Sequence, residues 1–119
     1  MYNVVKIGDK AVPMLSMASV DKYFKNIFGD DPIKMQAKGL DEAEAIDFIS
    51  RMGYVMAKFA EIANKKDMVK LNEDDYLEWL GQFERNEFFL ALPDMQKTYE
   101  GQLVTDADAK KNNAELTEE

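Results

Sequence analysis

The segment at residues 41–64 reads DEAEAIDFISRMGYVMAKFAEIAN and decides the fold that the sequence predicts. It opens with Asp41 and Glu44, which have the reciprocal spacing of an acidic capping box. Apolar side chains then recur at helical spacing in a broad stripe, which predicts a central helix over 42–64 that contacts several neighbours. Gly53 costs about 1 kcal/mol relative to alanine inside a helix. Close packing against another element would explain that glycine.

A β-hairpin is predicted at the amino terminus. Residues 4–7 and 11–15 are short runs of β-branched or apolar residues, and residues 8–10 between them suit a turn. Pro13 has no N–H to donate to a ladder, so the second strand is an edge or ends early. Because a lone hairpin is marginal in water, it must lie on the helices or on another chain.

Two short helices are predicted between the hairpin and the central helix. The first covers 20–28, where Ser19 is placed to cap its start and Gly29 to provide a left-handed end. The second follows Asp31, an N-cap candidate that precedes a proline, and runs to about residue 38.

The carboxy-terminal third contains two further helical signals. Asn72 is placed to cap a helix whose first turn is the acidic run 73–75. Pro93 is a suitable first residue of the last helix. Residues 104–119 have too little apolar content to offset the entropy of ordering. The sequence therefore predicts a mainly α fold, with a helical domain over 1–103 that begins with a β-hairpin, and a disordered acidic tail over 104–119.

Composition excludes several classes of function. The formal charge of −8 would repel a phosphate backbone, which argues against nucleic acid as a partner. No apolar run approaches the roughly 20 residues of a membrane span, and the amino terminus lacks a secretory pattern, so we expect a cytoplasmic protein without a membrane partner. The chain has no cysteine and no histidine, which excludes Ser-His-Asp, Cys-His and His-zinc chemistry.

Carboxylates are the remaining candidates for catalysis or metal binding. Residues 73–75 and 30–31 are acidic clusters of the kind that hard cations such as magnesium prefer. Acidic residues are also what a helix start favours, and no calcium-loop pattern surrounds either cluster. The glycines are scattered singly, so no phosphate-binding loop is present. We therefore expect no cofactor, no metal and no enzymatic activity.

The aromatic stripe of residues 23–28 can belong to the core or contact a partner. We expect Phe24 and Phe28 to be mostly buried, and Tyr23 to be the contact residue because it has a polar tip and lies beside Lys22. The chain also has eight methionines, whose flexible side chains suit irregular cores and surfaces that accept varied partners.

Three segments, in this order, resemble the tail assembly chaperones of siphophages and prophages of Gram-positive bacteria. They are PMLSMASVDKYFKNIFGDD at 13–31, AIDFISRMGYVMAKFAEIA at 45–63 and DDYLEWLGQFE at 74–84. The resemblance lies in a helix that ends at Phe28 and a glycine, a Tyr-x-Met-Ala-Lys helix from Tyr54, and a Trp-Leu pair at Trp79. It covers about residues 11–92.

The resemblance implies a non-enzymatic helper that binds the helical tape-measure protein, keeps it soluble and helps to recruit tail tube subunits. It further implies a homo-oligomer in the host bacterial cytoplasm that is absent from the mature virion, and often a longer product of ribosomal slippage. A groove of aromatic residues and methionines would accept the apolar stripe of the client helix. The candidate partner-contact residues are Tyr23, Tyr54, Met56, Trp79 and Phe83.

Two other functions are compatible with the sequence. An acidic regulatory protein could imitate nucleic acid and bind a host protein, a class that the charge of −8 favours. A carboxylate-dependent metal enzyme could use Asp74 and Asp75.

Overall fold

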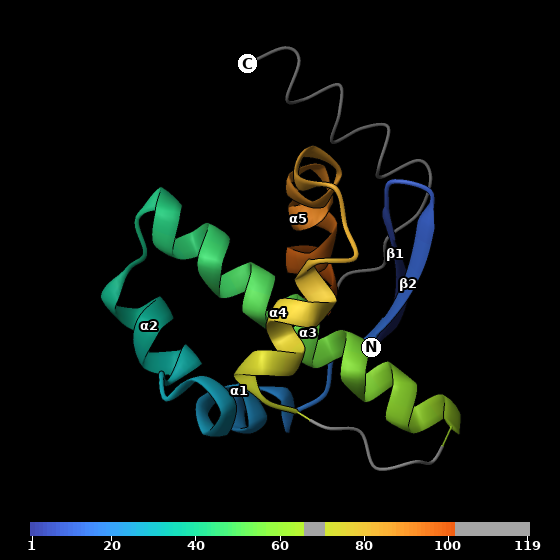
Figure 1. Ribbon diagram of the computed structural model, residues 1–119. Helices are drawn as coiled ribbons and strands as arrows, with labels where there is room; N and C mark the ends of the chain where they lie inside the picture. The colour runs from blue at the N-terminus through green and yellow to red at the C-terminus, as the bar shows by residue number, and fades with distance from the viewer. Residues whose placement is uncertain (66–70, 102–119) are drawn as a thin grey trace.

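The computed structural model describes residues 1–65 and 71–101. Over these residues a hairpin of strands β1 (Tyr2–Ile7) and β2 (Lys10–Leu15) precedes five helices (Figure 1). The helices are α1 (Val20–Phe28), α2 (Pro32–Lys38), α3 (Glu42–Lys65), α4 (Glu73–Leu80) and α5 (Arg85–Tyr99). The predicted mainly α fold with an amino-terminal hairpin is confirmed. The predicted tail over 104–119 lies outside the described residues.

Helix α3 is the central element of the fold. Figure 1 shows it crossing the molecule between the hairpin and helices α1 and α2, and it contacts α1, α4, α5 and β2. The predicted capping box is present, since the Glu44 amide donates to the Asp41 carboxylate at 2.8 Å and the Asp41 amide donates to Glu44 at 3.3 Å. The predicted broad stripe is buried on several sides, as a central helix requires.

Gly53 is the point of closest approach on α3. A Cβ atom at this position would lie 2.7 Å from the sulfur of Met95 on α5 and 3.7 Å from the Trp79 ring on α4. The expectation of close packing at this glycine is confirmed. The missing side chain allows two other helices to reach the same turn of α3.

The hairpin packs β1 on α5 and β2 on α3. Ile7 pairs with Lys10 across a two-residue turn, and Pro13 pairs with Val4. In such a hairpin the pair beside the turn exchanges hydrogen bonds and the exchange then alternates, so Pro13 falls on a pair that exchanges none. The ladder is intact because the position without an N–H points to the outer edge of β2.

The two short helices were predicted correctly, except for one cap. Gly29 ends α1 in the left-handed conformation with φ 80°, and the Asp31 carboxylate accepts from the amide of Ile33 at 3.0 Å at the start of α2. The prediction that Ser19 caps α1 with its side chain is wrong. Ser19 has helical dihedral angles, and it is its backbone carbonyl that accepts from the Tyr23 amide.

Helix α5 corrects the prediction that the last helix begins at Pro93. It begins at Arg85, where the Glu84 side chain accepts from the Glu87 amide at 3.2 Å, and Pro93 lies inside it. Pro93 is on the exposed side of the helix, so water can reach the carbonyl that loses its donor. Burial of the opposite side offsets the lost hydrogen bond, and this side carries Phe88, Ala91, Met95 and Thr98.

Candidate functional site

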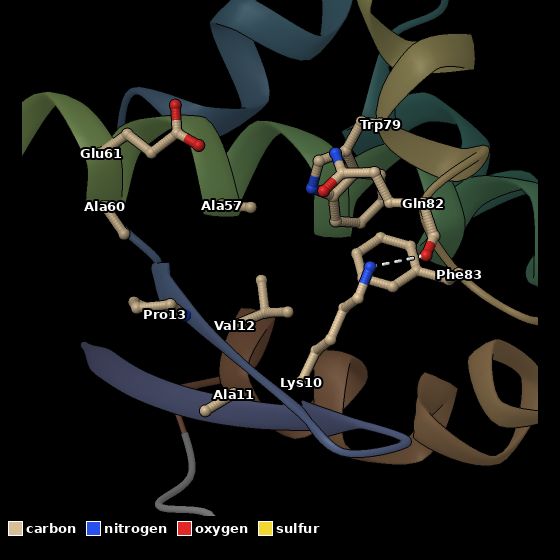
Figure 2. A pocket seen from close by; sticks show the side chains of 10 residues that line it. All are labelled: Lys10, Ala11, Val12, Pro13, Ala57, Ala60, Glu61, Trp79, Gln82 and Phe83. Carbon is tan, nitrogen blue, oxygen red and sulfur yellow. Dashed lines mark hydrogen bonds between the residues drawn. The ribbon is translucent and has the colours of Figure 1, made fainter.

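An open apolar groove of about 500 Å³ lies between the hairpin and helices α3 and α4. We call it the hairpin groove. Figure 2 shows Ala57 and Ala60 of α3 on one side and Val12 of β2 on the other, with Trp79 and Phe83 closing one end. Its walls are therefore mostly hydrocarbon.

The sequence explains how these side chains converge. Ala57 and Ala60 are three residues apart on α3, so they share a face, whereas Phe83 lies in the turn that follows α4 and packs beside Trp79 of that helix. The two rings pack edge to face with centroids 5.0 Å apart. On the α3 side Ala57 and Ala60 carry only methyl groups, and Glu61 adds a carboxylate beside them, so space remains between the helix and β2 (Figure 2).

Lys10 connects the tip of the hairpin to the end of α4. Its Nζ donates to the backbone carbonyl of Gln82 at 2.7 Å and lies 5.4 Å from the centre of the Phe83 ring (Figure 2). The contact is exposed, so its contribution to stability is small. The Lys10 side chain bridges β2 and the turn after α4 at one end of the hairpin groove.

Three of the five predicted contact residues are core residues. Tyr54 and Met56 have no exposed surface, and Trp79 is 4% exposed. The structure therefore corrects the expectation that Tyr54 and Met56 offer a contact surface, because both point into the packing between α3 and its neighbours. Trp79 is mostly core and reaches the hairpin groove with one edge.

Tyr23 and Phe83 remain accessible. Tyr23 is 44% exposed, and its ring packs edge to face on Phe59 at 5.0 Å. Phe24 is fully buried and Phe28 is half-buried against Tyr76, which agrees with the expected division of the α1 stripe. Tyr23 does not line the hairpin groove, whereas Phe83 does.

A second apolar hollow follows the other flank of α4. It consists of two adjoining parts of about 380 Å³ and 330 Å³ that share Asp47 and Tyr76. We call the two parts together the α4 trough. No sequence pattern predicted the α4 trough. Leu77 and Phe89 are apolar residues on the exposed sides of their helices. Its apolar lining is Phe28, Ala43, Ile46, Tyr76, Leu77, Leu80, Phe83, Phe88 and Phe89.

The charged groups in the α4 trough are largely paired. Arg51 forms ion pairs with Asp30 at 3.2 Å and with Asp47, and its guanidinium lies 5.2 Å from the centre of the Phe28 ring. Burial raises the pKa of Tyr76 to about 12, with a further contribution from the Asp47 charge. The Tyr76 hydroxyl is therefore neutral at physiological pH.

The acidic cluster at the start of α4 has structural partners. Asp75 accepts from the Tyr54 hydroxyl at 2.8 Å and lies 3.1 Å from the Lys58 ammonium. Burial and this hydrogen bond raise the pKa of Tyr54 above its ordinary value. Over the described residues, no three acidic side chains gather in a way that could hold a metal ion. Within the same residues, every helix is too short or too polar to cross a membrane.

Comparison of the chain with protein family models, with curated proteins and with solved structures found no match.

Proposed function

We propose that this chain is a phage tail assembly chaperone that binds the helical tape-measure protein through the hairpin groove. A long client helix presents apolar side chains at i, i+3, i+4 and i+7. The methyl groups of Ala57 and Ala60 leave room for such side chains, and the accessible Phe83 ring supplies apolar contact area beside the mostly buried Trp79. This groove is the observation that carries the proposal.

The proposed activity is binding without catalysis or cofactor. Two of the carboxylates that the sequence offered as catalytic candidates have structural partners, since Asp31 caps α2 and Asp75 joins Tyr54 and Lys58. A single groove binds a helix weakly, and weak sites repeated along a client gain strength through multivalency. The proposed partners are the tape-measure protein, the tail tube protein and further copies of this chain.

The proposed place of action is the cytoplasm of the bacterial host, before the mature virion forms. The charge of −8 supports a protein partner over nucleic acid, because a phosphate backbone would be repelled. Acidic residues at helix starts, such as Asp31 and Asp41, are engaged in capping and do not form an imitation of a phosphate backbone.

The test is co-expression with a tape-measure protein followed by affinity capture, for wild type and for Ala57→Leu. Ala57 lines the hairpin groove (Figure 2) and is only 4% exposed, so leucine would fill the groove, and a thermal melt of Ala57→Leu checks that the core still folds. We expect the wild type to capture the client and Ala57→Leu to lose it. Ala37→Leu, on the exposed side of α2, is the matched control and should capture normally. Absence of a complex with wild type across several clients would refute the proposal.

A further inference from the structure

We propose that the α4 trough is a docking site for an amphipathic helix of a partner protein, in which lysines or arginines flank the apolar stripe. The trough meets the hairpin groove at Phe83, which lines both, and its other lining residues are not shared with that groove. It goes beyond the proposed function, because its occupant is defined by chemistry and need not belong to a tape-measure protein.

The apolar part of the occupant follows from what the trough exposes. Leu77 is 64% exposed and Phe89 is 36% exposed, and the two residues stand in different parts of the trough. Between them Tyr76 and Leu80 continue the apolar lining. Burial of this lining against a partner removes apolar surface from water, which drives association.

The helical form of the occupant follows from the walls. The trough is bounded by α3, α4 and α5, and helices use their backbone groups internally. The first turns of α4 and α5 are capped by the side chains of Asn72 and Glu84. An extended peptide would find no strand edge here to pair with, whereas a helix arrives with its own backbone satisfied.

The positive charge of the occupant follows from α4 itself. This helix has four acidic residues and no basic residue, and Glu73, Asp74 and Glu78 are exposed. Of the two basic residues that line the trough, Arg51 is paired with Asp30 and Asp47. Arg85 keeps its positive charge over the Phe89 ring at 4.8 Å, so it offsets one negative charge at the α5 end, and the four carboxylates of α4 still outnumber it.

On the α3 side, Asp47 lines the trough, and the exposed Glu42 and Glu44 are the sequence neighbours of Ala43, which also lines it. The apolar floor therefore has a negative border on both helices. A helix that carries acidic flanks would meet like charge there, while lysine or arginine flanks would be attracted.

The experiment compares two designed helical peptides by fluorescence anisotropy with the purified chain. Both peptides have leucines at i, i+3, i+4 and i+7; one has lysines beside the stripe and the other has glutamates. We expect the lysine peptide to bind at least about tenfold more tightly, with an affinity that falls as salt is raised. Equal binding of both peptides, or no binding of either, would overturn the proposal.

Three variants locate the binding site. Leu77→Lys should lower the affinity for the lysine peptide by about tenfold or more, because the change removes an exposed apolar contact and adds a charge of the same sign as the peptide. Ile33→Lys is the matched control, since Ile33 on α2 is 67% exposed, and it should bind as wild type does. Ala57→Leu obstructs the hairpin groove from a residue that does not line the trough, and with its fold verified by a thermal melt it should also leave peptide binding unchanged. If Ala57→Leu abolished binding and Leu77→Lys did not, the peptide would occupy the hairpin groove and the trough proposal would be wrong.

Discussion

At the scale of single residues, the smallest side chains of α3 have the largest structural consequences. Gly53 lets Met95 and Trp79 approach the helix closely, and one turn later Ala57 leaves the space that becomes the hairpin groove. The sequence predicted the first effect, because a glycine in a helix interior needs a reason. The sequence did not predict the space beside Ala57, because alanine is an ordinary helix residue that requires no structural explanation.

Tyr76 supplies a prediction about pH. Its pKa rises from an ordinary value of 10.0 to about 12 in the folded chain, mainly through burial. Between these values the unfolded chain loses the phenolic proton and the folded chain keeps it, so the free energy of unfolding should fall as pH rises from about 10 to about 12. Urea unfolding at several alkaline pH values measures this fall.

The variant Tyr76→Phe separates the contribution of Tyr76 to this pH dependence from the contributions of the other tyrosines. Without the hydroxyl, the fall in stability over the same pH range should be smaller than in wild type. Tyr23→Phe, at an exposed position, is the control. An identical pH dependence in wild type and Tyr76→Phe would show that Tyr76 does not contribute.

At the scale of elements, local signals were predictive where local interactions decide the structure. Asp31 and the pair Asp41 and Glu44 cap their helices as predicted, because a cap needs only the side chain and the backbone a few residues away. The start of α5 was missed because Pro93 is a strong local signal for a helix start. Packing of Phe88 and Met95 against the rest of the molecule overrides it.

Helix caps provide a paired prediction at this scale. The Asn72 side chain accepts from the Asp75 amide at 2.8 Å, whereas the Ser19 side chain makes no cap hydrogen bond. Asn72→Ala should therefore lower the free energy of unfolding by about 1 kcal/mol. Ser19→Ala should change it by much less, and chemical denaturation measures both. Equal losses in the two variants would contradict the cap assignment.

At the scale of the whole molecule, contact surfaces depend on which elements meet. Tyr54, Met56 and Trp79 were predicted as partner-contact residues, but tertiary packing buries all three, and Trp79 is the one of them that lines a groove. The grooves arise where β2, α3, α4 and α5 leave gaps, and such gaps are fixed by tertiary packing. Only Phe83 was both predicted as a contact residue and found at an accessible position in a groove.

We propose that the hairpin groove binds a client helix. Amide hydrogen exchange of the chain, measured alone and with a helical tape-measure segment, tests it most directly. We expect slower exchange on client binding at the outer edge of β2 and in the turn after α4 that carries Phe83, with α2 unaffected. Unchanged exchange in β2 and α4 in a chain that demonstrably binds the client would contradict it.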